Sequence, residues 1–312
     1  MAEAGQAMEW LGVLAAVLSS GLGGTSVGAT RYLAEALDPL TLGALRFGIG
    51  ALLLLPLALR VPAGRPQPGE WPGLIGLGLL FFGLFPILFN ASLIFTTAAR
   101  GGLALSTVPL LTMLAAALLG VERLTLRKSL GVLVAMAGVA AALLLSLAKA
   151  PEGAWRGDLL MVAAAGCMAL YNVWSRRLVR RLGAVPFATF GMAVGALCLG
   201  TVAVATGGLP SLARLETAQW AAVLYLGVFG GALTFWLWAF ALLRTTPTRV
   251  AISVTVNPVL AALIGAMLLG EPLHWSLVIG LAMVALGIWL SASNPDGRLV
   301  GTLPVATGRP PG

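Results

Sequence analysis

Long apolar runs without charged residues dominate the chain, and short charged connections separate them. A tenth run, 39–59, differs from the other nine only in containing Arg46. The nine are 10–30, 71–99, 101–121, 129–148, 159–175, 182–213, 217–243, 250–270 and 275–295. Nearly all reach the roughly 20 residues that an α-helix needs to cross a hydrocarbon core. The pattern therefore predicts an all-α integral membrane protein with ten transmembrane helices.

The second half of the chain repeats the first. At an offset of 149 residues, 71–140 aligns with 220–289 without a gap, and an offset of 145 extends the match upstream. Pairs of identical residues include Trp10/Trp155, Trp71/Trp220, Thr96/Thr245, Thr97/Thr246, Arg100/Arg249, Pro109/Pro258 and Glu122/Glu271. Matches of Leu or Ala mean little in such a composition, whereas matches of Trp, Arg, Pro and Glu are informative.

We therefore predict two homologous five-helix repeats, 10–148 and 155–293. The segment 1–9 would be a cytoplasmic N-terminus and 149–154 a linker. The remaining segment, 294–312, is rich in Pro and Gly and is expected to be a disordered cytoplasmic tail.

Because five is an odd number, the second repeat must enter the membrane from the opposite side. With a cytoplasmic N-terminus, the inside segments hold 13 Lys and Arg and the outside loops hold 5. This is the distribution that the positive-inside rule expects. The repeats are therefore predicted to have inverted topology, which is a common build of secondary transporters with a substrate site between the halves.

Composition excludes several classes of protein. With 59% hydrophobic and 10% charged residues and a mean hydropathy of +0.97, the chain is not a soluble globular protein. The net charge of +8 is attributed to cytoplasmic loops and not to a nucleic-acid partner. The sequence holds no metal-ligand cluster, no Ser-His-Asp or Cys-His set and no nucleotide-binding Gly-Lys-Ser/Thr loop. We predict neither enzymatic activity nor a cofactor nor a metal.

Three features together resemble a known family. These are the paired five-helix halves, Arg46-Phe47 in the second run, and a proline in the fourth and ninth runs before a Gly-Glu-like end at 120–122 and 270–272. They resemble the EamA-type transporters of the drug/metabolite transporter superfamily over about 10–292. The aromatic amino-acid exporters of the YddG type are most similar. In the first half, Val121 separates Gly from Glu, which departs from the pattern.

That resemblance implies a basket-like bundle with a central cavity lined mainly by helices 1, 3, 4, 6, 8 and 9. Pro109 and Pro258 interrupt the fourth and ninth runs at matching positions. A proline removes a backbone hydrogen bond and bends a helix, so the pair is predicted to form two hinges, with a static kink as the alternative.

An apolar pocket with a few polar groups would hold an amphiphile with a large apolar side chain. Phe85 and Phe89 share one helix face, and Ser253 and Asn257 share another. The predicted substrate-binding residues are Thr25, Phe85, Phe89, Asn90, Tyr171, Trp174, Trp238, Ser253 and Asn257. The alternative for each is ordinary helix packing, lipid contact or, for most tryptophans, the membrane interface.

Charged groups inside the membrane are the remaining candidates. Arg46 would either meet a substrate carboxylate or tie helices together, and we favour the structural role. No Asp or Glu is expected deep in the bundle, because Glu122 and Glu271 fall at helix ends. A buried proton carrier is therefore not predicted, and transport is expected to be facilitated or weakly coupled.

Together these features predict a secondary transporter of a bacterial inner membrane with both termini cytoplasmic. It would export aromatic or large apolar amino acids by alternating access, with the lipid bilayer and small molecules as partners and as a monomer or a homodimer. The alternatives are another cargo on the same fold, such as a drug, sugar or nucleotide sugar, or a channel. A membrane enzyme or a structural subunit is less consistent with the sequence.

Overall fold

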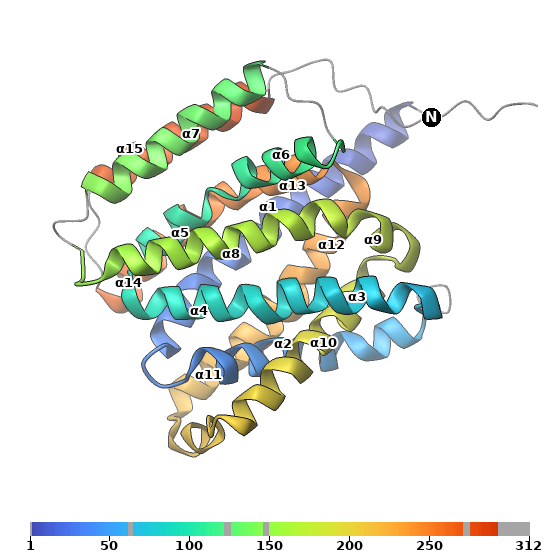
Figure 1. Cartoon of the computed structure of the whole chain (residues 1–312), viewed down its shortest axis with the longest axis vertical. Helices are drawn as coiled ribbons and strands as arrows, with labels where there is room; N and C mark the ends of the chain where they lie inside the picture. Colours follow the sequence, from blue (N-terminus) through green and yellow to red (C-terminus); the bar gives the residue numbers. More distant parts are fainter. Residues whose placement is uncertain (1, 62–64, 122–125, 146–149, 271–274, 293–312) are drawn as a thin grey trace, which may run out of the picture.

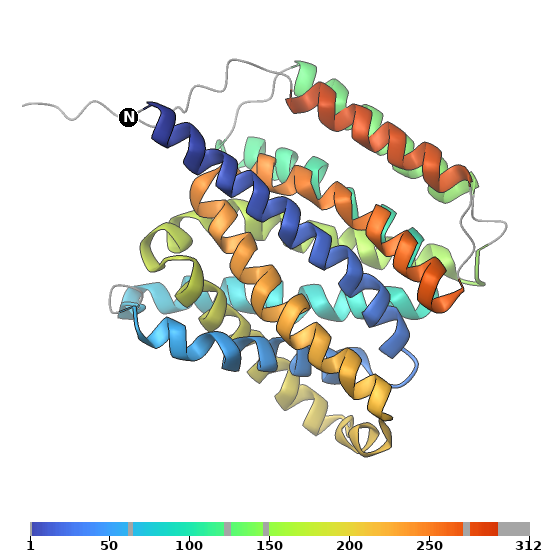
Figure 2. The same ribbon diagram turned by 180° about the vertical axis from the view of Figure 1, so that it is seen from behind.

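The chain folds as a bundle of roughly side-by-side helices (Figures 1 and 2). The computed structural model describes residues 2–61, 65–121, 126–145, 150–270 and 275–292, and within these ranges it contains helices and no strand. Glu122, Glu271, His274 and the predicted tail 294–312 lie outside the described residues. The prediction of an all-α membrane protein is confirmed.

Eight described segments are long and apolar enough to cross a membrane. They are Met8–Leu33, Pro39–Leu59, Pro68–Phe95, Ala98–Leu118, Ala154–Trp174, Ala184–Ala205, Thr217–Arg244 and Pro247–Leu268. The elements in chain order are α1 (Ala2–Leu33), α2 (Pro39–Leu59), η2 (Pro68–Glu70), α3 (Trp71–Gly78), η3 (Leu79–Leu84), α4 (Phe85–Phe95), α5 (Ala98–Leu105), α6 (Val108–Leu118), α7 (Leu126–Leu145), α8 (Ala154–Trp174), α9 (Arg176–Leu182), α10 (Ala184–Ala205), η5 (Leu209–Arg214), α11 (Thr217–Gly227), η6 (Val228–Leu233), α12 (Thr234–Arg244), α13 (Pro247–Ile252), η7 (Ser253–Thr255), α14 (Val256–Leu269) and α15 (Trp275–Ala292).

The repeated sequence forms repeated local structure. The segments η3 and η6 are both π-helices, and their positions differ by the same 149 residues that relate the sequences. Thr97 and Thr246 cap the helices that follow, because each hydroxyl accepts a hydrogen bond from the backbone N–H three residues on, at 3.3 Å. Matching residues therefore interrupt and restart the third, fourth, eighth and ninth helices in the same way.

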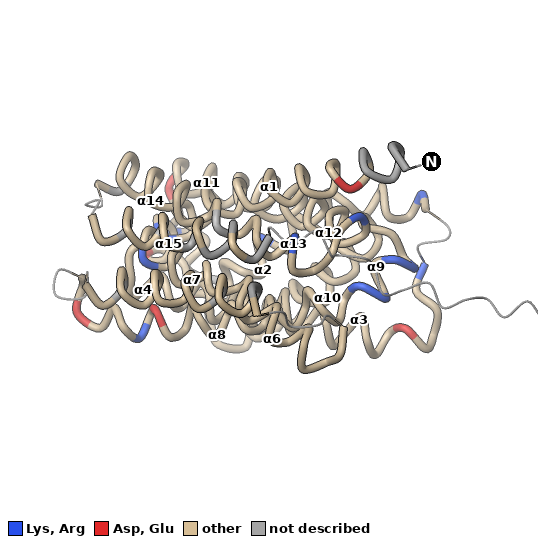
Figure 3. Tube along the Cα trace, turned by 90° about the horizontal axis from the view of Figure 1, so that it is seen from above, with Lys and Arg blue, Asp and Glu red and all other residues tan. Residues whose placement is uncertain are grey.

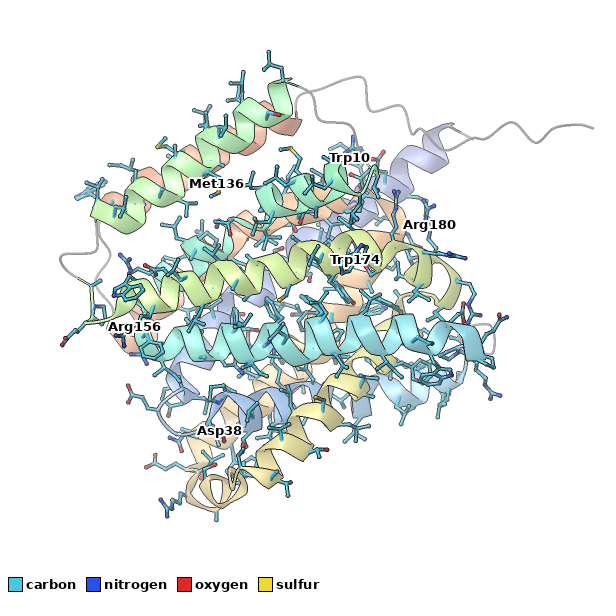
Figure 4. The ribbon with its side chains drawn as sticks, in the orientation of Figure 1. Trp10, Asp38, Met136, Arg156, Trp174 and Arg180 are labelled. Carbon is cyan, nitrogen blue, oxygen red and sulfur yellow. The ribbon has the colours of Figure 1, made fainter. Side chains whose placement is uncertain are left out.

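The two copies run in opposite directions. Trp10, near the start of the first repeat, lies at one end of the bundle, and Arg156, beside the matching Trp155, lies at the other end (Figure 4). The short helix α9, which carries four arginines, lies at the end that holds the N-terminus (Figure 3). This end is the one predicted to be cytoplasmic.

Helices α7 and α15 pack against each other at the edge of the bundle (Figures 1 and 2). They lie where the fifth and tenth helices are predicted. A Cβ atom at Gly138 would lie 2.4 Å from the Cβ of Met283, and one at Gly280 would lie 2.5 Å from the Cβ of Ala142. Small residues allow such close helix approach in membranes. These two glycines are therefore already used in packing within one chain.

We expect Gly280→Ala to destabilise the protein, because the added methyl overlaps Ala142 in the α7–α15 contact. Overpacking of this kind costs about 1–3 kcal/mol. The measurement is the thermal unfolding midpoint of the purified protein in detergent. Gly166→Ala is the matched control, since a Cβ there meets nothing within 4 Å. Equal midpoints for the two variants would contradict the packing described here.

Candidate functional site

A group of aromatic rings fills the main hydrophobic core. Phe81 of η3 stacks on Tyr171 of α8 with ring centroids 4.0 Å apart, and Phe85 lies 5.0 Å from Phe81. Phe89 continues the group, at 5.4 Å from Phe85. The structure thus brings three predicted substrate-binding residues, Phe85, Phe89 and Tyr171, to one buried aromatic cluster through Phe81, which the sequence analysis did not select.

A hydrogen-bonded chain of three buried side chains connects α12, α8 and α6. The indole Nε1 of Trp238 donates to Oδ1 of Asn172 at 3.0 Å. In turn, Nδ2 of Asn172 donates to Oγ1 of Thr112 at 3.4 Å. Buried polar groups are costly unless they are paired, so this chain fixes α12, α8 and α6 relative to one another. Trp238 was predicted as a site residue, whereas Thr112 was missed.

The small and polar face of α1 contacts the spans Thr217–Arg244 and Pro247–Leu268. The hydroxyls of Ser20 and Ser253 lie 2.7 Å apart, and those of Thr25 and Tyr225 lie 2.5 Å apart. The hydroxyl of Ser253 also donates to the carbonyl of Val250 at 2.7 Å. Two predicted residues, Thr25 of α1 and Ser253 of η7, therefore lie where α1 contacts the second repeat, whereas the aromatic cluster joins η3, α4 and α8.

Asn257 stands apart from these paired groups. Its side chain is buried, with 5% of the residue exposed, and within the described structure its Oδ1 has no hydrogen-bond partner. The amide faces α1 where that helix has no side chain, since a Cβ at Gly23 would lie 3.2 Å from Oδ1. An unpaired buried acceptor costs about 1–3 kcal/mol. Among the predicted site residues that the structure describes, Asn257 is therefore the one whose buried acceptor could take a hydrogen bond from a ligand.

Both predicted hinge prolines follow a break in their helices. Pro109 is the second residue of α6, after the turn that ends α5, and Pro258 is the third residue of α14, after the 3₁₀ segment η7. Each lacks the N–H that would bond the carbonyl four residues earlier. The start of α14 packs closely on α5, because a Cβ at Gly102 of α5 would lie 3.0 Å from the Cα of Pro258. The kinks are present, and hinge motion stays a prediction.

Arg46 contacts backbone in the second repeat. Its Nε and one terminal nitrogen donate to the carbonyl of Gly230 in η6 at 3.1 and 2.7 Å. The rings of Phe47 and Phe235 lie 5.5 and 5.7 Å from the guanidinium carbon. The side chain thus joins α2 to the π-helix and satisfies backbone that the irregular turn leaves available. These contacts fit the structural role favoured from the sequence.

Two predicted residues lie away from both groups. The amide of Asn90 faces the start of α2, where Nδ2 donates to the carbonyl of Pro39 at 2.9 Å. Trp174 is 50% exposed and lies on the outer surface beside α9 (Figure 4).

The structure corrects the expectation that no carboxylate is buried. Asp158, the fifth residue of α8, forms an ion pair with Arg100 of α5, and their side chains are 11% and 4% exposed. Oγ1 of Thr96 donates to the other carboxylate oxygen at 3.2 Å. The expectation failed because both charges border apolar runs and were assigned to loops. The pair joins the two repeats, since Arg100 lies in the first and Asp158 in the second.

A second ion pair, which includes the repeat partner of Arg100, lies at the other end. Arg249, the repeat partner of Arg100, pairs with Glu9 of α1, and these side chains are 49% and 42% exposed. Glu9 lies near the N-terminal end, whereas α8 begins at the opposite end (Figure 1). Each pair therefore links the first helix of one repeat to the fourth of the other. In this structure one is buried and the other is open to solvent.

The two asparagines provide a test of this description. We expect Asn90→Ala to lower the unfolding midpoint, because it removes a hydrogen bond worth about 0.5–1.5 kcal/mol. Asn257→Ala should cost less, because it also removes a buried acceptor that has no partner in the described structure. Thermal unfolding of both variants in the same detergent measures the difference. A larger loss for Asn257→Ala would contradict the assignment of its amide as unpaired.

Comparison with known proteins identifies relatives over most of the chain. The model of the EamA-like transporter family matches residues 10–144 and 155–293. The "Uncharacterized transporter YyaM" of Bacillus subtilis is 25% identical over 279 residues, which cover 87% of this chain and 90% of that protein. The "Uncharacterized protein PA1977" of Pseudomonas aeruginosa is 33% identical over 240 residues, which cover 76% of this chain and 78% of that protein.

One relative has a more specific name, and one solved structure has the same fold. A "Probable terminal-alkyne amino-acid exporter" of Streptantibioticus cattleyicolor is 25% identical over 262 residues, covering 82% of this chain and 86% of that protein. A crystal structure with 23% sequence identity superposes with a TM-score of 0.66 over 92% of this chain and 96% of its own. The resemblance to the EamA-type transporters is confirmed. The chain belongs to the EamA-like transporter family of the drug/metabolite transporter superfamily.

Proposed function

We propose that this protein is a secondary transporter that exports amino acids with aromatic or large apolar side chains by alternating access. It would act in a bacterial inner membrane with its N- and C-termini in the cytoplasm. The family and the names of its relatives indicate a transporter and not an enzyme. The cargo, the direction and the mechanism are the proposed part.

The observation that carries the proposal is the pair of matching ion pairs at opposite ends of the bundle. Inverted repeats exchange roles when a carrier passes from one state to the other. The pair Arg100–Asp158 is buried while its counterpart Arg249–Glu9 is exposed. In the alternate state we expect the reverse, with Arg249–Glu9 buried and Arg100 separated from Asp158. Closure at one end would then accompany opening at the other.

The buried residues favour a zwitterionic or neutral cargo. Aromatic rings of α4 and α8 offer apolar contact, and Asn257, near the middle of the ninth helix, offers an acceptor for an ammonium group. A sugar phosphate would need several basic groups at this depth, whereas Arg46 is already bonded to Gly230. The name of the Streptantibioticus relative adds support for amino-acid export.

The buried acid changes the argument for coupling. Facilitated or weakly coupled transport was predicted because no internal carboxylate was expected, and the burial of Asp158 removes that reason. We nevertheless propose uncoupled transport, since Oδ1 of Asp158 accepts from Thr96 and Oδ2 pairs with Arg100. Both carboxylate oxygens are thus engaged in contacts that close the end of the bundle opposite the N-terminus. This favours a structural role for Asp158 over a role as proton carrier.

Counterflow in proteoliposomes tests the proposal. Vesicles containing wild-type protein and unlabelled phenylalanine should transiently accumulate labelled phenylalanine from outside, equally with and without a proton gradient. Asn257→Ala should reduce the initial rate about tenfold, which corresponds to one lost hydrogen bond of about 1.4 kcal/mol. Asn90→Ala, normalised to folded protein, should transport at nearly the wild-type rate.

Each other outcome would change a particular part of the proposal. Accumulation that requires the gradient would overturn uncoupled transport. A counterflow signal for other metabolites but not for phenylalanine would overturn the cargo. Conductance without counterflow would indicate a channel and overturn the carrier mechanism.

A further inference from the structure

A groove lies on the outer surface between α3 and the corner formed by α8 and α9. Its volume is about 840 Å³, and its lining includes Gly73, Gly76, Leu77, Trp174, Arg177 and Arg181. Trp174 and Gly76 are exposed, so the groove opens away from the core. It lies at the end of the bundle that carries α9, which Figure 4 marks with Trp174 and Arg180. The groove is separate from the core residues assigned to transport.

One part of the groove is apolar and has the shape of a slot. Along α3, Gly76 has no side chain, and a Cβ built there would meet no atom within 4 Å. Leu77 and Leu80 of the third span and Leu178 of α9 line the slot. The missing side chain leaves a strip of open apolar surface that runs along the helix axis, into the predicted membrane span Pro68–Phe95.

The other part is cationic. Arg181 is held in place by an ion pair with Glu70 and by a hydrogen bond of 2.8 Å to the carbonyl of Arg65. Arg177 is exposed and lies near enough to Glu70 for the two charges to interact. Arg180 is exposed on the same short helix. Glu70 offsets one of these charges, so the mouth of the groove remains positive.

The two parts match a ligand that is anionic at one end and apolar along its length. Basic pockets between membrane helices bind the head groups of anionic lipids, and tryptophan prefers the boundary between head groups and acyl chains. We propose that this groove binds one anionic phospholipid of the leaflet on the α9 side. Its phosphate lies at Arg177 and Arg181, its glycerol region at Trp174, and one acyl chain along Gly76 and Leu77.

A phospholipid explains features that a soluble phosphate does not. The apolar slot would contribute nothing to a small anion, whereas it buries acyl carbon in a lipid complex. The opposite end of α8 carries Trp155 and Arg156, but there the guanidinium lies 5.5 Å above the indole ring. There the tryptophan and the arginine contact each other, and the pair therefore provides a matched control.

Native mass spectrometry of the full-length, delipidated protein measures the binding. We expect one phosphatidylglycerol per chain, bound more tightly than phosphatidylcholine with the same acyl chains, and little competition from inorganic phosphate. Arg177→Ala should weaken phosphatidylglycerol binding about fivefold, the effect of one basic residue near an anionic membrane surface. Gly76→Leu should weaken it by obstructing the slot without changing any charge. Trp155→Ala and Arg156→Ala should bind as the wild type does.

Three outcomes would overturn parts of this proposal. Equal affinity for the two lipids would overturn the role of the arginines, and full competition by inorganic phosphate would overturn the role of the slot. Phosphatidylglycerol binding that is unchanged in both Arg177→Ala and Gly76→Leu would place the lipid elsewhere. Circular dichroism of each variant confirms that it is folded, and either variant alone decides the question if the other does not fold.

Discussion

The ion pair between Arg100 and Asp158 is the interaction on which the arrangement of the two repeats depends at one end of the bundle. Two charges inside an apolar bundle are stable only when they neutralise each other and are hydrogen bonded, and removing one partner of such a buried pair costs about 3–5 kcal/mol. The matching pair, Arg249–Glu9, is half exposed, and pairs in that setting contribute about 0–1 kcal/mol. The two ends of the bundle thus differ, because the pair at one end is buried and the pair at the other end is exposed to solvent.

Several helices in the bundle are interrupted, and side chains provide hydrogen-bond partners for the backbone groups at these interruptions. In a bilayer, backbone groups that leave a helix need new hydrogen bonds. Arg46 supplies them at Gly230 in the π-helix η6, and threonines supply the caps where α5 and α13 restart. Pro258, which follows one break, lies against Gly102 of α5, the helix that precedes the other break. The two broken segments are therefore packed on each other through α5 and α14.

The sequence predicted the helices, the repeat and the direction of each half, because apolar run length and matched Trp, Arg and Pro depend on local patterns. It selected Asn257 correctly as an internal amide but gave no reason to rank it above Asn90, since only packing reveals that Asn90 bonds Pro39 while Oδ1 of Asn257 has no partner in the described structure. It missed Asp158 because charge counting ends an apolar run at the first charge, although a charge one turn inside a helix can be buried by its neighbours. The match of Arg100 with Arg249 was the available signal, but their partners, Asp158 and Glu9, do not match in the alignment.

The most direct test of alternating closure is a pair of spin-label distances measured by double electron–electron resonance in a background without Cys167 and Cys198. Labels at Glu35 and Arg156 report the end near the buried pair, and labels at Met8 and Arg180 report the end that carries the N-terminus; all four positions are exposed. Asp158→Asn removes the charge of the buried pair. The account predicts that this change lengthens the first distance and shortens the second in the same protein. Unchanged distances at both ends, or lengthening at both, would contradict it.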